Sequence, residues 1–239
     1  IPMFLGLLFQ QFYSMVDTLI VGKFLGVNPL AGVGSTTSLN FMVLGFCMGV
    51  CNGFSIPVAQ KFGAKDESGL RRFVANSVWL SVIFAAVMTV VVCILCRQIL
   101  IWMDTPANIL EGSYRYIFVI FLGIPVTYLY NLLSGIMRAL GDSKTPLIFL
   151  ILSSVLNIVF DLGAILILHM GVAGAAWATV TAQGISGVLC LIYMKKKYTI
   201  LKISKDEWKL NGSCIARLCG MGIPMGLQYS ITAIGSVVL

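Results

Sequence analysis

Long apolar runs, separated by short polar segments, dominate the pattern of this chain. Four runs of at least 22 residues carry no charged side chain: Phe73–Cys96, Tyr116–Met137, Gly171–Met194 and Leu218–Leu239. About 20 apolar residues suffice to cross a bilayer as an α-helix. Because lipid offers no hydrogen-bond partners, each run must satisfy its backbone internally, which favours helices over strands.

The same pattern predicts an all-α membrane protein, a polytopic bundle of seven transmembrane helices. Their approximate ranges are 1–22, 37–60, 73–96, 114–138, 145–168, 171–194 and 216–239. We divide the chain into a six-helix N-lobe (1–194), an inter-lobe linker (195–215) and the first helix of a second lobe (216–239). Ile1-Pro2-Met3 recurs as Ile223-Pro224-Met225, six spans and one linker later, as expected for two halves of equal orientation.

Both ends of the sequence lie inside apolar runs. We therefore expect the natural protein to extend in both directions, with a C-terminal lobe as the partner of this chain. Linker residues 199–211 mix apolar and charged side chains. This segment either forms a short helix on the inner membrane surface or is a plain solvated linker.

Composition supports the membrane assignment and excludes several functions. Hydrophobic residues make up 59% of the chain, charged residues only 10%, and the mean hydropathy is +0.97. The net charge of +7 does not indicate nucleic-acid binding, because the basic residues lie in loops between apolar spans. The seven cysteines fall mostly inside spans, where packing explains them, and a single histidine does not form a metal cluster by itself. We find no catalytic motif, so the chain is not expected to be an enzyme and needs no cofactor.

The basic residues are distributed unevenly between the two ends of the predicted bundle. Thirteen of the 16 follow an even-numbered span: Lys61, Lys65, Arg71, Arg72, Arg138, Lys144, Lys195, Lys196, Lys197, Lys202, Lys205, Lys209 and Arg217. Loops on the cytoplasmic side of a membrane are enriched in Lys and Arg. The sequence thus predicts a multi-pass protein of the cell membrane with a cytoplasmic N-terminus.

Two acidic residues, Asp17 and Asp161, lie within predicted spans rather than in loops. A charged side chain at the centre of a membrane helix costs about 2.5–3.5 kcal/mol on insertion scales. Such a carboxylate is a candidate functional group, and the alternative is a structural carboxylate hydrogen-bonded between helices. No Lys or Arg occurs in mid-span to pair with either acid.

Other polar side chains also lie within the spans. They are Gln10 and Tyr13 on the helix face of Asp17, Asn157 one turn before Asp161, Thr179 in the sixth span, and the pair Asn131 and Ser134 in the fourth. Oxygen atoms of this kind ligate a small hard cation such as sodium, or surround a protonated carboxyl group. Periodicity alone does not show that the separate polar faces meet.

Several segments resemble multidrug and toxic compound extrusion (MATE) transporters. They are 10–22 (QQFYSMVDTLIVG), 30–34 (LAGVG), 59–64 (AQKFGA), 135–146 (GIMRALGDSKTP) and 171–179 (GVAGAAWAT). The resemblance covers the whole chain. It implies two six-helix lobes around a central cavity that exchange organic, often cationic, compounds for sodium or protons by alternating access.

The resemblance also implies roles for individual residues. An N-lobe cation-coupling site, with sodium as the candidate metal ion, would use Asp17, Asn157, Asp161 and Thr179. Gln10 and Tyr13 would line a substrate cavity, to which we add Asn131 and Ser134 as candidate contacts. The implied partners are an organic small molecule, membrane lipid and the C-terminal lobe.

This efflux antiporter has three alternatives: a lipid or lipid-linked saccharide flippase of the same architecture, an ion channel and a membrane-embedded enzyme. A flippase is expected to carry basic residues inside its spans to hold phosphate. A channel needs repeated pore rings or a selectivity loop, and an enzyme needs a catalytic pair. The two mid-span acids favour export of a cation.

The charge distribution generates a topology prediction. We expect the loop at Lys202 to be cytoplasmic and the loop at Asp104 to be external. In a cysteine-free background, Asp104→Cys in intact cells should react with an impermeant maleimide, and Lys202→Cys should react only after the cells are opened. Labelling of Lys202→Cys from outside would contradict the assignment.

Overall fold

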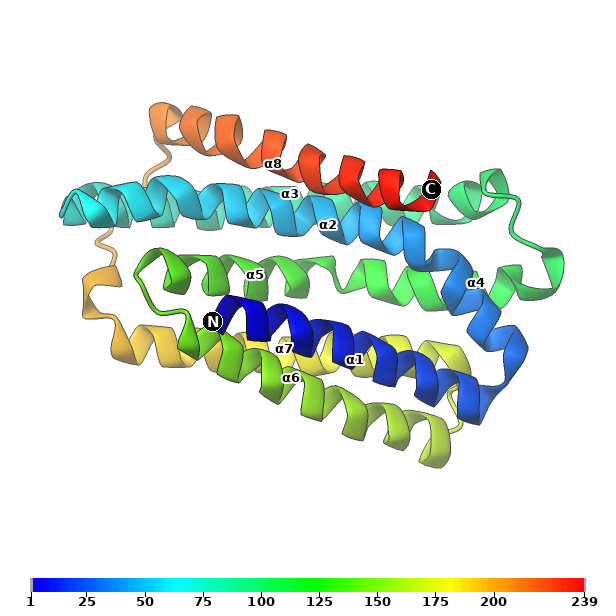
Figure 1. Ribbon diagram of the computed structural model, residues 1–239. Helices are drawn as coiled ribbons and strands as arrows, with labels where there is room; N and C mark the ends of the chain where they lie inside the picture. Colours follow the sequence, from blue (N-terminus) through cyan, green and yellow to red (C-terminus); the bar gives the residue numbers. More distant parts are fainter. Residues whose placement is uncertain (1, 239) are drawn as a thin grey trace.

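The computed structural model describes residues 2–238, without the side chains of 2–7, 10, 11, 13, 14, 27–29 and 233–238. Helices run side by side along one common direction, and no strand occurs among these residues (Figure 1). The elements are α1 (Pro2–Leu25), α2 (Val27–Gly63), α3 (Glu67–Trp102), α4 (Ala107–Leu122), α5 (Ile124–Ala139), α6 (Lys144–Leu162), a π-helical turn (Gly163–Ile167), α7 (Gly171–Lys197), a 3₁₀ turn (Thr199–Leu201) and α8 (Gly212–Val238).

The helices have the length and composition of membrane spans, which confirms the predicted all-α membrane fold. Four of them qualify individually within the described residues: Leu30–Gly63, Glu67–Trp102, Lys144–Ile167 and Gly171–Lys197. α4 and α5 qualify together as one broken span with a bend of 46°. α1 and α8 lie in the same bundle, with 24 and 27 residues. The division into lobes and linker stays a prediction.

Glycines explain two departures from the predicted spans. α2 begins at Val27 rather than near residue 37, because Gly26 reverses the chain within one residue at φ 93°. The fourth span breaks at Gly123, just before Pro125, where a Cβ atom would lie 2.5 Å from the Val180 side chain of α7. The missing side chain lets α7 approach, and proline, which has no N–H, sits in the first turn of α5.

A row of small residues joins α2 to α8. Cβ atoms built at Gly49 and Gly53 would lie 2.6 Å from the Met225 carbonyl oxygen and 2.5 Å from the Gly222 Cα atom, closer than real side chains approach. Gly45 lies in the same row, 3.8 Å from the Tyr229 side chain by the same measure. The glycine spacing therefore serves close helix contact.

The segment between α7 and α8 is docked onto α3, so it is neither a surface helix nor a plain solvated linker. Arg71 of α3 forms an ion pair with Glu207 at 2.8 Å, and Glu207 is only 8% exposed. The Trp79 indole donates to the Trp208 carbonyl oxygen at 3.2 Å. The backbone hydrogen bond from Ser204 and the hydrogen bond from Arg71 hold the pKa of Glu207 below its ordinary value.

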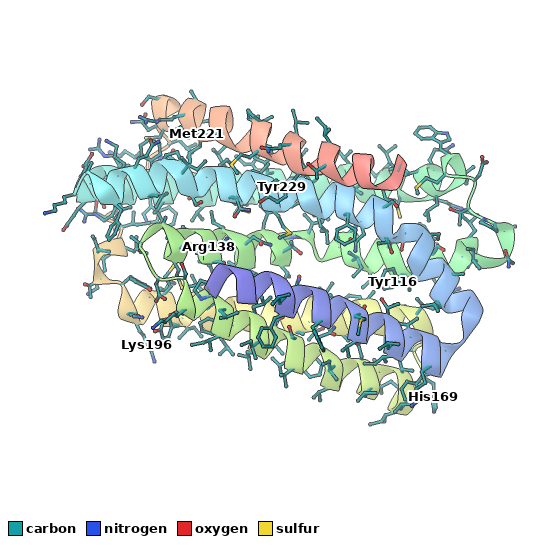
Figure 2. The ribbon with its side chains drawn as sticks, in the orientation of Figure 1. Tyr116, Arg138, His169, Lys196, Met221 and Tyr229 are labelled. Carbon is teal, nitrogen blue, oxygen red and sulfur yellow. The ribbon has the colours of Figure 1, made fainter. Side chains whose placement is uncertain are left out.

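Basic loops gather at one end of the bundle. The turn after α2, the turn after α5 and the segment after α7 lie at the same end in Figure 1. Lys196 and His169 mark the two opposite ends of the bundle in Figure 2. The alternating charge pattern requires the basic loops to share one end of the bundle, as they do. That this end is cytoplasmic stays a prediction.

Asp142 organises the turn between α5 and α6. Its carboxylate accepts from the Thr145 backbone N–H at 3.0 Å, the Thr145 hydroxyl at 2.7 Å and the Tyr198 hydroxyl at 2.6 Å. Lys197 completes the cluster as an ion pair at 3.0 Å. Burial raises the pKa of Asp142, but these hydrogen bonds outweigh it and hold the pKa well below its ordinary value.

We expect Asp142→Asn to destabilise the bundle by about 1–3 kcal/mol, because it removes charge-assisted hydrogen bonds to three partners. A group with a depressed folded-state pKa stabilises fully above its unfolded pKa of about 3.9 and loses that effect as the pH falls through the folded value. The unfolding midpoint in detergent should therefore be lower than wild type at pH 7, and the gap should shrink in acid. Glu111→Gln, a surface change of equal charge, is the control; equal midpoints for wild type and Asp142→Asn would contradict the assignment.

Candidate functional site

α6 carries the two most deeply buried polar side chains of the candidate site. Asn157 is 1% exposed and Asp161 is 0% exposed, one turn apart on the inner face of α6. Because residues four apart share one helix face, both side chains are directed toward the neighbouring helices. The sequence-predicted pair thus occupies the protein interior rather than the lipid-facing surface.

α7 supplies the third group. The Asn157 amide lies 3.0 Å from the Thr179 hydroxyl oxygen. When the amide oxygen faces Thr179, it accepts from that hydroxyl at 3.0 Å, while the amide nitrogen donates to the Asp161 Oδ2 atom at 2.9 Å. This orientation satisfies both ends of the amide. Asn157 therefore connects Thr179 on one helix to Asp161 on its own.

Asp17 brings α1 to the same place. The carboxyl groups of Asp17 and Asp161 lie next to each other, within reach of a hydrogen bond. Each carboxyl group nevertheless keeps one buried oxygen, Oδ1, with no hydrogen-bond partner. α1 packs against both α6 and α7, which brings all four predicted coupling residues into one cluster.

The cluster can hold a small cation or a proton. Leaving a buried carboxylate oxygen unpartnered is costly, and two carboxylates in a low-dielectric interior do not both remain charged without compensation. No Lys or Arg of the described residues forms an ion pair with either acid. Two carboxyl groups, an amide and a hydroxyl are the hard oxygen ligands that suit sodium. The described residues contain no group of three or more His, Cys, Asp or Glu that could hold a metal ion.

The four predicted substrate contacts do not join this cluster in the described part of the chain. The side chains of Gln10 and Tyr13 lie outside the described residues. The Asn131 amide bends back onto its own helix and donates to the Thr127 carbonyl oxygen at 2.8 Å. Ser134 is buried at 4% exposure on α5. These assignments stay predictions.

A second polar chain, which the sequence pattern does not predict, crosses the bundle. Arg138 of α5 donates to the Asn52 side-chain oxygen of α2 at 3.1 Å. Asn52 in turn donates to the Tyr229 hydroxyl of α8 at 3.4 Å, so three helices are linked (Figure 2). Arg138 stands next to a loop in sequence, which suggests a helix-end cation. Its reach toward α2 depends on packing that periodicity does not reveal.

Comparison with known proteins places the chain among transporters. It is 29% identical to the probable multidrug resistance protein YoeA of Bacillus subtilis over 99% of its length. It is 31% identical to the probable multidrug resistance protein YpnP of the same organism over its full length. The chain spans about half the length of these relatives, 53% in both cases.

Solved structures show the same arrangement of helices. A multidrug resistance MATE family transporter of the MOP superfamily in its outward-facing conformation matches 95% of the chain with a TM-score of 0.88 and 25% identity. A MOP superfamily transporter from Pyrococcus furiosus matches 95% with a TM-score of 0.89 and 25% identity. The chain covers 51% and 50% of these two proteins.

The family comparison gives the most direct assignment. The MatE family model matches residues 2–162, which include α1 to α6 and three of the four residues of the carboxylate cluster. MATE proteins are transporters, so the expectation that the chain is not an enzyme is confirmed. Together with the helical bundle and the relatives, this match establishes that the chain belongs to the MatE family of multi-pass membrane transporters.

Proposed function

We propose that this chain is part of a secondary active antiporter that exports organic compounds in exchange for sodium or protons. The observation that carries the proposal is the buried carboxyl pair of Asp17 and Asp161, each with an unpartnered oxygen. Relatives named for multidrug resistance support drug efflux as the transported function.

The coupling mechanism follows from the electrostatics of the cluster. With no cation bound, ionised Asp17 and Asp161 repel each other across the contact between α1 and α6, and low dielectric strengthens that repulsion. A proton or a sodium ion removes the repulsion and draws the two helices together. Asn157 and Thr179 add neutral oxygens, which help a metal ion more than a proton.

Ion occupancy can thereby bias the conformation of α1. An ion shifts a conformational equilibrium only by its difference in affinity between the two states. The four ligands come from three helices, so a small displacement of α1 changes the affinity strongly. Gln10 and Tyr13 lie on the same helix, which would place substrate contacts on the element that responds to the ion.

A flippase remains a second candidate function because of Arg138. Its guanidinium group is half-buried between helices and has only the neutral Asn52 as a hydrogen-bond partner among the described residues. A cation in that position suits a phosphate or carboxylate group of a substrate. Substrate export assays with cationic dyes and with lipid-linked phosphates would separate the two functions.

Substitutions in the cluster test the coupling site. In full-length protein reconstituted in proteoliposomes, Asp17→Asn and Asp161→Asn should each abolish dye efflux driven by a sodium or a proton gradient. Thr179→Val should weaken sodium-driven efflux about 10-fold and spare proton-driven efflux, because it removes one metal ligand and no acid. Thr181→Val, an exposed position on the same helix, and Asp206→Asn, on the surface, are the matched controls. Normal efflux by Asp161→Asn under both gradients would leave Asp161 as a structural carboxylate.

Substrate choice gives a separate test. An aromatic ring next to a bound organic cation contributes about 0.5–2 kcal/mol, which corresponds to roughly 2- to 30-fold in affinity. Tyr13→Ala should therefore weaken export of flat aromatic cations by that factor more than export of small aliphatic cations. Phe12→Ala removes an exposed ring from the same turn and should change neither. An equal loss for both substrate classes would assign Tyr13 to packing.

A further inference from the structure

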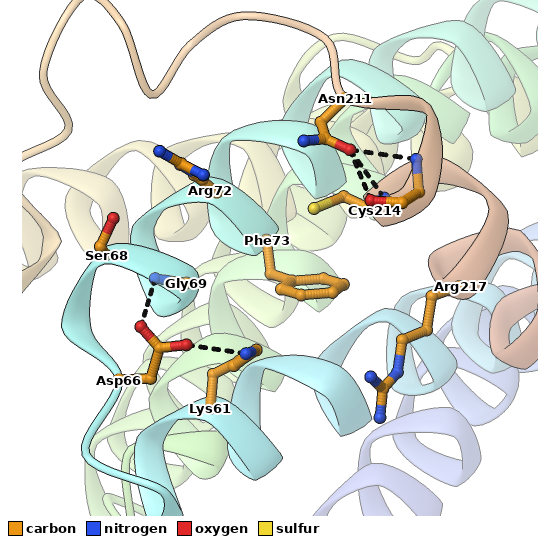
Figure 3. Close-up of a pocket in the computed structure, with 10 residues that line it drawn as sticks. Lys61, Asp66, Ser68, Gly69, Arg72, Phe73, Asn211, Cys214 and Arg217 are labelled. Carbon is orange, nitrogen blue, oxygen red and sulfur yellow. Dashed lines mark hydrogen bonds and ion pairs between the residues drawn. The ribbon is translucent and has the colours of Figure 1, made fainter.

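A polar pocket lies at the basic end of the bundle, far from the carboxylate cluster along the helices. The last turn of α2, the first turns of α3 and the start of α8 enclose a volume of about 380 Å³ (Figure 3). Binding pockets for small molecules typically begin at about 300 Å³. Nothing in the proposed efflux mechanism uses this pocket.

Positive charge exceeds negative charge in its lining. The lining contains three basic side chains, Lys61, Arg72 and Arg217, and one acidic side chain, Asp66. The Lys61 Nζ atom forms an ion pair with the Asp66 Oδ2 atom at 2.7 Å. This hydrogen bond holds the pKa of Asp66 below its ordinary value. Asp66 also caps α3 by accepting from the Gly69 backbone N–H at 2.8 Å. The two oxygens of Asp66 thus contact Lys61 and Gly69, and neither forms an ion pair with Arg72 or Arg217 among the described residues.

The two guanidinium groups have no carboxylate partner among the described residues. Arg217 donates to the neutral Gln60 side-chain oxygen at 2.7 Å. The Arg72 side chain forms no ion pair within the described part of the chain. Figure 3 shows Arg72 on one side of the Phe73 ring and Arg217 with Lys61 on the other. The pocket thus presents fixed positive charge on two sides.

Helix ends add to this field. α3 begins at Glu67 and α8 begins at Gly212, and both first turns line the pocket. The start of a helix carries the positive end of its dipole, which favours a bound anion. Asn211 caps α8 by accepting from the Ser213 N–H, while its own N–H donates to Asn76 of α3. Asn211 thus ties the start of α8 to the third turn of α3.

The pocket also lies near the level of an aromatic pair. Trp79 stands seven residues, or two turns, after Arg72 on α3 and packs edge-on against Trp208 with ring centres 6.4 Å apart. Both rings are partly exposed, at 44% and 39%. Tryptophan is enriched where lipid headgroups meet the hydrocarbon core. A ligand in the pocket would therefore lie at headgroup depth or just outside it.

We propose that this pocket binds a phosphate-bearing anion through Arg72 and Arg217. The ligand chemistry is a phosphate monoanion or diester, and its source is either the headgroup of an anionic phospholipid or a soluble phosphate compound. Bidentate hydrogen bonding from arginine to phosphate oxygens gives both charge and geometric match. Binding there would brace α2, α3 and α8 against one another.

The test measures thermal stabilisation of full-length protein in neutral detergent. Phosphatidylglycerol should raise the unfolding midpoint of wild type more than phosphatidylcholine does. The variant Arg72→Gln/Arg217→Gln should require about 10-fold more phosphatidylglycerol for the same shift. The control Lys202→Gln/Lys205→Gln removes the same amount of charge from the same end of the bundle and should behave as wild type. Arg72→Lys/Arg217→Lys keeps the charge, and it should recover part of the effect if the glutamine variant folds poorly.

A second arm distinguishes the source of the phosphate. Inorganic phosphate is added to lipid-free protein, with chloride at equal ionic strength as the reference. A shift by phosphate that depends on Arg72 and Arg217 would support the site with a soluble ligand, and a shift by phosphatidylglycerol alone would support it with a lipid headgroup. Equal responses of wild type, the glutamine variant and the control to both additives would overturn the proposal.

Discussion

In a lipid environment, burial of apolar surface does not hold helices together, so the bundle depends on close backbone approach and on polar contacts between helices. Both are visible here and occupy different interfaces. α2 and α8 meet through glycines, at distances that leave no room for a Cβ atom. α1, α6 and α7 instead meet at the Asp17, Asp161 and Thr179 cluster. The candidate site therefore also helps to hold α1, α6 and α7 together. The ionisation state of Asp17 and Asp161 would affect how these helices pack.

Sequence pattern predicted the parts of the structure that depend on local composition. Apolar runs located every span, and the spacing of Asn157 and Asp161 placed both on one inward face. The pattern did not show that Asp17 meets Asp161, because helix rotation and neighbour choice are tertiary properties; only the family resemblance implied it. It also missed the break at Gly123 and the docking of Glu207 on Arg71, since both depend on a partner distant in sequence. Substrate contacts such as Tyr13 stay predictions for the same reason.

Polar contacts at the basic end fix the segment between α7 and α8 to α3 and to the turn between α5 and α6. Asp142 binds Tyr198 at its beginning, Arg71 binds Glu207 in its middle, and Asn76 binds Asn211 at its end. A segment held at three points does not act as a free tether. A motion between halves of a transporter that includes this chain would then have to occur at helix interfaces. The α2–α8 interface is itself closely packed, because the Phe54, Val50 and Phe46 side chains of α2 fill the space at Gly222 and Gly226 of α8.

Coupling between ion and substrate requires an element that senses both, and α1 meets this requirement best. It packs against α6 and α7 at the carboxylate cluster and against α2 on another side. Neutralising the pair of Asp17 and Asp161 removes a repulsion that acts across the contact between α1 and α6, whereas α2 and α8 meet through uncharged glycines. Under the proposed function, ion binding would therefore act mainly on the contact between α1 and α6. Because Tyr13 and Gln10 precede Asp17 by about one and two turns on that helix, a displacement of α1 would move the candidate substrate contacts together with the ion ligand.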